Sequence, residues 1–335
     1  MKRLLYILVF FLSLVAIGSC AGYYYATRQY EGAAVRVNVG KSFSNNDLRA
    51  LLCDSLGENF GNKVYNIWNM RGGSLSRAHG SYLVKPGETA FRVAMRLRGG
   101  MQDAVNVTIP NLRSYERVLE VISDNFEFEG VDLKSAFDSV LIANDIPREC
   151  APAVIMPDTY QYYWTAGASS VAVSLLKQWN VFWTDARKAK ASTLNLDPLE
   201  VSTLASIVEE ESARRDERPV IARLYLNRLE RGMKLQADPT VKYAVGDPTL
   251  RRILNMHLST PSPYNTYIID GLPPGPIRVV DKATVDAVLN SPRNNYLYMC
   301  AKEDFSGYHN FASTLAEHNA NARRYHAALN RNNIK

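Results

Sequence analysis

The sequence predicts an α+β protein with a single transmembrane helix at its N-terminus, a small region of strand–turn–helix units and a larger mixed α+β domain. Three observations predict this organisation. Residues 4–27 carry no charge, residues 28–130 repeat a strand–turn–helix pattern, and residues 156–335 hold long helical patterns around a proline-rich loop at 260–277. Residues 1–3 are then a cytoplasmic tip, and residues 131–155 a helical connector.

The uncharged N-terminal run is long enough to cross a membrane. Its 24 residues reach roughly 36 Å as a helix, more than the ~30 Å hydrocarbon core of a bilayer. Lys2 and Arg3 precede it, so the positive-inside rule places the N-terminus in the cytoplasm and everything after Arg28 outside.

Three fates of this run remain open. A retained anchor would place Tyr23–Tyr25 at the membrane interface. A signal peptide would be cleaved near Ala21, and a lipoprotein would carry its lipid on Cys20. We favour the retained single-pass anchor in the inner (cytoplasmic) membrane, with the lipoprotein second. All three place the body of the protein outside the cytoplasm.

Composition narrows the classes of partner. The net charge of +6 and a pI near 9.0 are typical of a soluble basic domain or of one attracted to phospholipid headgroups or a wall polymer. Nucleic acid is excluded as a partner, because the chain has no basic helix or nucleic-acid motif.

The cysteines and histidines predict neither a metal nor a cofactor, because their spacing matches no ligand motif. Cys53, Cys150 and Cys300 form either one disulfide with one buried thiol or three thiols in the core.

The strand–turn–helix pattern occurs three times. Strands are expected at 34–39, 80–84 and 105–109, each followed by a helix. Thr89 and Ser114 are expected to cap the second and third of these helices, since their hydroxyls can accept from free N–H groups.

The larger domain is predicted to be mainly helical. Helices are expected at about 170–190, 198–214, 217–230 and 313–330, with a strand at 296–300. The second begins at Asp197–Pro198, a cap followed by proline in the first turn, and the third stops at Gly232. Gln236 and Asp238 are expected in extended chain, because a proline follows them.

Three adjacent acids close the helix at 198–214. Helical phase points Glu210 into water, places Glu209 on the flank of the apolar stripe and places Glu211 inside it. A carboxyl on an apolar face must find a partner or keep its proton, and a protonated carboxyl is what a general acid requires. A solvated acidic face is the alternative.

The words SIVEEES, GMKLQADPTVKYA, PSPYNTY and GLPPGPI occur in order within residues 156–319. This text resembles the YceG-like family of endolytic murein transglycosylases, which cut nascent peptidoglycan strands. The resemblance implies that Glu209 is the catalytic acid/base. Glu211 and Asp238 are candidates for supporting roles, with Glu211 otherwise paired to Arg214, Arg215 or Arg218.

The resemblance also suggests residues that bind the glycan. They are polar or aromatic side chains of the PDTY word, the LQADP word and the proline-rich loop: Asp158, Tyr160, Gln236, Tyr264, Asn265 and Tyr267. In addition, YLVKPGETAFRVAMRL at 82–97 is similar to LysM modules, which bind N-acetylglucosamine chains. The alternative for the individual side chains is a role in packing, and the alternative for the LysM-like stretch is a scaffold.

The implied reaction cleaves the bond between N-acetylmuramic acid and N-acetylglucosamine and leaves a 1,6-anhydro end. One acid suffices, because the attacking hydroxyl belongs to the same sugar. Two alternatives remain open: a muramidase, which needs a second carboxylate, and a membrane-tethered scaffold that binds peptidoglycan without cutting it. Peptidoglycan synthases are candidate partners.

Overall fold

The computed structural model describes residues 2–247, 249–250 and 252–332, which form two compact units. Helices dominate both, and the strands named here form two-stranded sheets, which confirms the predicted α+β class. The first unit comprises residues 1–107, 124–127 and 160–167, and the second 108–123, 128–159 and 168–335.

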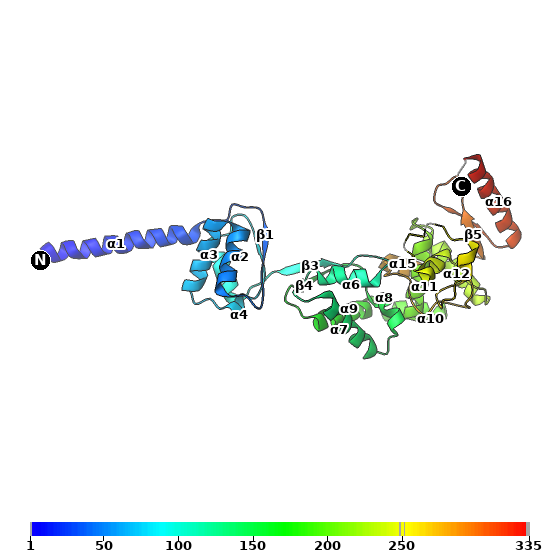
Figure 1. Ribbon diagram of the computed structural model, residues 1–335, viewed down its shortest axis with the longest axis horizontal. Coiled ribbons are helices and arrows are strands. Elements are labelled where there is room, and N and C mark those ends of the chain that lie inside the picture. Colours follow the sequence, from blue (N-terminus) through cyan, green and yellow to red (C-terminus); the bar gives the residue numbers. More distant parts are fainter. Residues whose placement is uncertain (1, 248, 251, 333–335) are drawn as a thin grey trace. The chain divides into compact units, whose positions relative to one another are not determined.

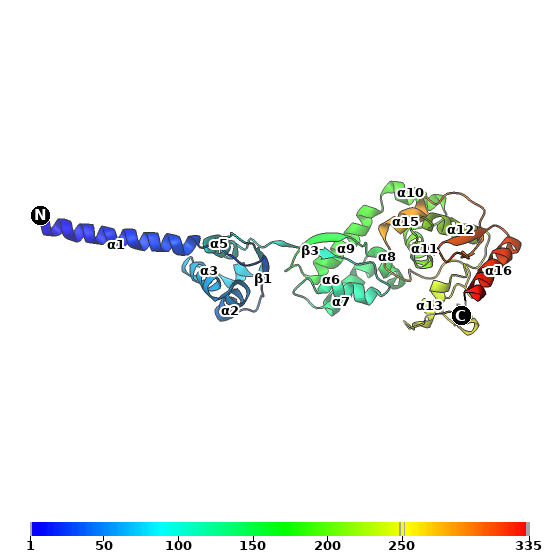
Figure 2. The same ribbon diagram turned by 90° about the horizontal axis from the view of Figure 1, so that it is seen from above.

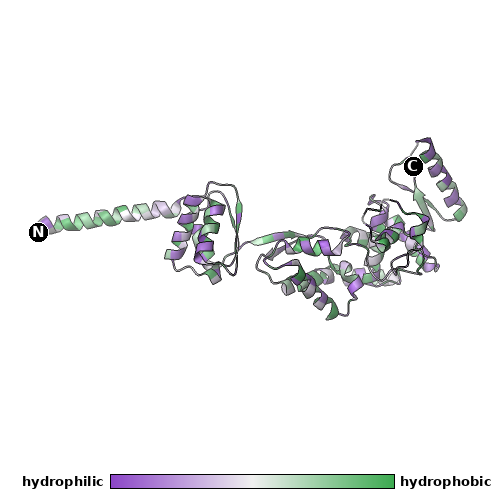
Figure 3. Ribbon diagram, in the orientation of Figure 1, coloured by the Kyte–Doolittle hydropathy of each residue, from purple (hydrophilic) through white to green (hydrophobic). Residues whose placement is uncertain are grey.

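The first unit begins with helix α1, Lys2–Thr27. Residues Leu5–Thr27 are long and apolar enough to cross a membrane, and their side chains are exposed along most of the helix. Figure 3 shows the hydrophobic colouring along α1. The expected membrane helix is therefore a helix in the structure, and its exposed apolar surface suits a lipid environment.

The remainder of the first unit is a two-stranded sheet covered by helices. β1 (Val35–Val39) pairs antiparallel with β2 (Gly80–Val84), with Val37 opposite Tyr82. Both side chains are buried in a core shared with the helices α2 (Asn45–Leu56), α3 (Glu58–Met70), α4 (Leu75–Ala78) and α5 (Ala90–Gly99).

Local signals set these elements, with two differences from expectation. Thr89 caps α5 as predicted, accepting from the Arg92 N–H at 3.2 Å. Helix α3 was not predicted, since it follows α2 after the single residue Gly57, whose φ of +83° favours glycine. The third expected strand is present as β3 (Ala104–Thr108), and it pairs with β4 (Thr159–Tyr163), a strand that was not predicted.

The second unit is mostly helical, with a short C-terminal hairpin. Its elements are α6 (Tyr115–Ser123), α7 (Gly130–Ile142), the 3₁₀ helix η1 (Arg148–Cys150), α8 (Ala151–Val154), α9 (Ala168–Phe182), α10 (Asp185–Thr193), α11 (Pro198–Glu211), α12 (Arg218–Glu230), α13 (Asp238–Val245), α14 (Asn255–Leu258), α15 (Lys282–Leu289), β5 (Tyr298–Ala301), β6 (His309–Ala312) and α16 (Leu315–Arg331). The helix expected at 170–190 is two helices, because Thr184 caps α10.

Helix α11 lies at the centre of this unit. Figures 1 and 2 both show it beside α12 and α15, and residues Val201 to Glu209 are all buried. The small side chains of Ser202, Ala205 and Ser206 let neighbours approach closely, and the Ile277 N–H donates to Ser206 Oγ at 3.0 Å. The proline-rich loop is thereby attached directly to α11.

The start of α11 follows its sequence signal, whereas its end does not. Asp197 accepts from the N–H groups of Leu199 and Glu200, and Glu200 accepts from Asp197 in return. The helix stops at Glu211 and not at 214, because Ser212 is extended, with φ −137° and ψ 127°. Glu211 is thus the last helical residue.

Removing the cap of α11 should weaken the second unit. Asp197→Ala leaves two N–H groups without their acceptor, so we expect a loss of about 1 kcal/mol in the free energy of unfolding. Urea unfolding of the full chain measures it. Asp185→Ala, which removes an acid from the first turn of α10 but not its Thr184 cap, is the matched control. An equal loss in both variants would contradict a specific role of the cap.

Candidate active site

A cleft of about 1440 Å³ opens in the second unit. The C-terminal end of α11 and the start of α13 form part of its wall. The start of α6, residues 276–278 of the proline-rich segment and the last turns of α16 contribute other parts. This volume exceeds the ~300–1,000 Å³ of common small-molecule sites, so the cleft has room for a polymer segment.

Glu211 is the carboxyl in this cleft whose environment most favours a bound proton. Its side chain is partly buried, and the Tyr225 hydroxyl donates to Oε1 at 2.6 Å. Burial raises the pKa of Glu211 to about 7, with the neighbouring Asp238 adding to the rise and the Tyr225 hydrogen bond opposing it. Tyr225 is thus the partner of Glu211 in the structure, whereas Arg215 pairs with Asp281 and Arg218 with Glu209.

Asp238 lies beside Glu211 on the cleft wall. It begins α13 and is not in extended chain as predicted, because Pro239 occupies the first turn of that helix, where proline is favourable. The Tyr267 hydroxyl donates to Asp238 Oδ1 at 2.7 Å. The structure therefore brings together Glu211, Asp238 and Tyr267, with Tyr264 also on the cleft wall.

Glu209 lies elsewhere. The cleft lining, as far as the structure describes it, does not include this residue, and its side chain is only 4% exposed. Its oxygens accept from the Asp281 N–H at 2.9 Å and from the Asn111 amide, and the Arg218 guanidinium lies 3.6 Å away. Glu209 is thus a buried carboxyl group with two hydrogen-bond donors and a nearby guanidinium, and these contacts join the end of α11 to three other segments.

Glu210 does not lie in water, contrary to prediction. Its side chain is 8% exposed and pairs with Arg113 and Arg278. Arg278 directly follows the proline-rich loop and lies more than sixty residues from Glu210 in the sequence, so the helical phase of α11 alone could not indicate this contact. Glu210 therefore lies on the cleft wall in ion pairs with these two arginines.

The other candidate residues have mainly structural contacts. Asn265 is fully buried and donates to the carbonyls of Leu258 and Thr260. Gln236 accepts from Arg228, and Asp158 pairs with Lys282 at 2.7 Å. Tyr160 belongs to β4 in the first unit.

Sequence reasoning missed the partners that define the acids. Tyr225, Arg218, Arg113 and Arg278 each sit in a segment whose polarity pattern is ordinary, and none of the four belongs to α11. The RPVIARLYLNRL text of α12 contained one usable signal, since Tyr225 falls within an apolar run and a buried tyrosine needs a hydroxyl partner.

Known proteins resemble this chain in sequence and in structure. An endolytic murein transglycosylase of Bacillus subtilis is 27% identical over 269 residues, which is 75% of this chain and 74% of that protein. One from Streptococcus pneumoniae is 32% identical over 138 residues, 40% of this chain and 24% of that protein. A crystal structure of a putative yceG-like protein from Listeria monocytogenes matches with a TM-score of 0.54 and 25% identity, covering 86% of this chain and 98% of that one.

The family follows from a match to its sequence profile over most of the chain. The profile described as the YceG-like family matches residues 58–324, which include all of α11 and the carboxyl groups of the cleft. This extent confirms the resemblance in the SIVEEES and LQADP text: the chain belongs to the YceG-like family.

Proposed function

We propose that this protein is an endolytic lytic transglycosylase that cleaves the N-acetylmuramic acid–N-acetylglucosamine bond of nascent peptidoglycan strands and leaves 1,6-anhydro ends. The observation that carries the proposal is Glu211, a carboxyl on the wall of a large cleft with its pKa raised to about 7. The relatives named endolytic murein transglycosylase support the same class of reaction.

Glu211, and not Glu209, is proposed as the acid/base. A general acid must reach the substrate and hold a proton near neutral pH, and Glu211 meets both requirements. Glu209 is enclosed by Asn111, Arg218 and the Asp281 backbone, and it is not among the described residues that line the cleft.

The reaction then runs in two steps. Protonated Glu211 donates its proton to the glycosidic oxygen as the bond from that oxygen to C1 of the muramic residue breaks. The Glu211 carboxylate next takes the proton of the C6 hydroxyl, whose oxygen bonds to C1 of the same sugar. No water is consumed. The Asp238 carboxylate lies beside Glu211 and would stabilise the positive charge that develops at C1.

The second candidate function is that of a muramidase, in which Asp238 would serve as the second carboxyl group. A retaining or inverting hydrolase needs two carboxyl groups, and Asp238 is close enough to Glu211 to raise its pKa. The two reactions differ in their products, since hydrolysis leaves reducing muramic ends that are heavier by one water.

Mass spectrometry of digested peptidoglycan tests the proposal. The full chain is incubated with uncrosslinked strands, and the ends are identified by mass. We expect cleavage at internal bonds of the strands, with anhydromuramic ends on the products. Reducing ends would make the protein a hydrolase, and intact strands would make it a peptidoglycan-binding scaffold.

The place of action is proposed from α1. A retained anchor would hold the cleft-bearing unit outside the inner membrane, where nascent strands and their synthases work. A lipid on Cys20 is the second choice. Cell fractionation with mass determination of the N-terminal peptide separates the two.

The two neighbours of Glu211 should shift the pH dependence of cleavage in opposite directions. Asp238→Asn removes the negative charge that raises the pKa of Glu211, so the loss of activity at alkaline pH should begin at a lower pH. Tyr225→Phe removes a hydrogen bond that lowers this pKa, so the loss should begin at a higher pH. Profiles of kcat/KM against pH measure both, and shifts in the same direction would contradict the assignment.

A further inference from the structure

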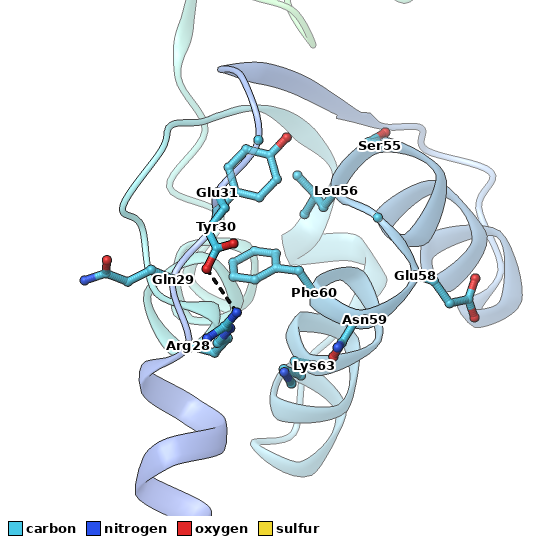
Figure 4. A pocket seen from close by; sticks show the side chains of 12 residues that line it. Arg28, Gln29, Tyr30, Glu31, Ser55, Leu56, Glu58, Asn59, Phe60 and Lys63 are labelled. Carbon is cyan, nitrogen blue, oxygen red and sulfur yellow. Dashed lines mark ion pairs between the residues drawn. The ribbon is translucent and has the colours of Figure 1, made fainter.

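A second pocket, of about 530 Å³, lies in the first unit directly after α1 (Figure 4). Two stretches line most of it, residues 28–32 and residues 55–60, and Lys63 of α3 completes it. Neither the transglycosylase reaction nor the comparisons assign it a role. We propose that this pocket binds the headgroup phosphate of an anionic membrane phospholipid.

The position of the pocket directly after α1 favours a lipid ligand. Helix α1 has 26 residues and ends at Thr27, so Arg28 is the first residue beyond it. Such a helix is about 39 Å long, enough to span the ~30 Å hydrocarbon core and reach the headgroup layer. With α1 in the membrane, the residues that follow it lie at the height of lipid phosphates.

Ring packing and backbone hydrogen bonds fix the walls of the pocket. The rings of Tyr30 and Phe60 meet at a centroid distance of 5.3 Å, and each residue is 7% exposed. Tyr30 is held on both sides of its backbone, donating to the Glu88 carbonyl and accepting from the Gly87 N–H, each at 2.8 Å. Gly32 lies against the Tyr30 ring so closely that a Cβ there would be 2.4 Å from the hydroxyl oxygen.

Charge selects the ligand. Arg28 pairs with Glu31 at 3.0 Å, whereas within the described part of the chain no carboxylate pairs with Lys63. The Lys63 ammonium lies 5.7 Å from the ring centroid of Tyr25, a residue of the last turn of α1. Figure 4 shows Arg28 and Lys63 at the end of the pocket nearer to α1, below Phe60, with Glu58 directed away.

Glu58 also lines the pocket, and its Oε1 accepts from the Asn62 amide at 3.0 Å. At the end nearer to α1, Arg28, Glu31 and Lys63 leave an excess of one positive charge, which matches the single negative charge of a phosphodiester. A zwitterionic headgroup would place a second positive charge beside Lys63. Glu31 would not balance that charge, because it already pairs with Arg28. The apolar floor of Tyr30, Leu56 and Phe60 suits the glycerol and upper acyl carbons that follow the phosphate.

Lipid retention by the full chain tests this site. The protein in detergent micelles receives equal amounts of phosphatidylglycerol and phosphatidylcholine, and native mass spectrometry gives the ratio retained. We expect wild type to prefer phosphatidylglycerol, and Lys63→Gln to lower that preference roughly tenfold, as loss of one charge-assisted contact would. Lys85→Gln, an exposed lysine outside the pocket, is the matched control and should keep the preference.

Three results would overturn the proposal. Equal losses in Lys63→Gln and Lys85→Gln would indicate general surface attraction, and equal retention of both lipids by wild type would remove the anionic preference. Displacement of phosphatidylglycerol by an N-acetylglucosamine oligomer would assign the pocket to glycan. Each variant must unfold at the same temperature as wild type, so that a change in lipid preference reflects the pocket and not a change in the fold.

Discussion

Glu211→Gln is expected to lower the rate of glycan cleavage by about a hundredfold to ten-thousandfold, the usual contribution of a general acid. Glutamine keeps the size of the side chain and can accept from Tyr225, but it has no acidic proton to give. The rate of appearance of anhydromuramic ends measures the loss. Glu120→Gln, which removes an exposed acid of α6 outside the cleft, should cleave at the wild-type rate.

The same variant has a second consequence that does not depend on activity. The pKa of Glu211 is raised in the folded chain to about 7 from an ordinary 4.5. Its contribution to stability is therefore full below pH 4.5 and is lost as the pH rises to 7, by about 3 kcal/mol in total. Glu211→Gln should thus unfold at a higher temperature than wild type above pH 7. Equal unfolding temperatures across this range would contradict the raised pKa.

Glu209→Ala is expected to destabilise the second unit by about 3–5 kcal/mol, the usual effect of breaking a buried ion pair from one side. The change leaves the Arg218 guanidinium, which is 8% exposed, without its charge partner and frees the Asp281 N–H. Urea unfolding of the full chain measures the loss.

Glu209→Gln separates stability from catalysis. Glutamine can still accept from the Asp281 N–H but carries no charge, so a smaller loss of stability is expected than for alanine. At a temperature where this variant remains folded, it should cleave glycan at close to the wild-type rate. A folded but inactive Glu209→Gln would return the catalytic role to Glu209, as the motif resemblance implied.

Much of the local structure was predictable because its causes are local. The Asp197–Pro198 start of α11, the Thr89 cap of α5 and the irregular proline-rich loop depend on residues a few positions apart. Distant segments decided what local signals could not. The strand expected at 105–109 is present, but its partner β4 was not predicted, and Glu210 meets Arg278 instead of water.

The sequence by itself determined the family and the position of the acidic segment, because both depend on residue identity along one stretch of chain. Helical phase also placed Glu211 on the apolar face of its helix. Only the tertiary structure decided the proposed roles of the acids. A carboxyl keeps or loses its proton according to its burial and neighbours, and for Glu211 those neighbours come from α12 and α13. Folding surrounds Glu209 with donors, and it leaves Glu211 in the cleft with a tyrosine and a second acid.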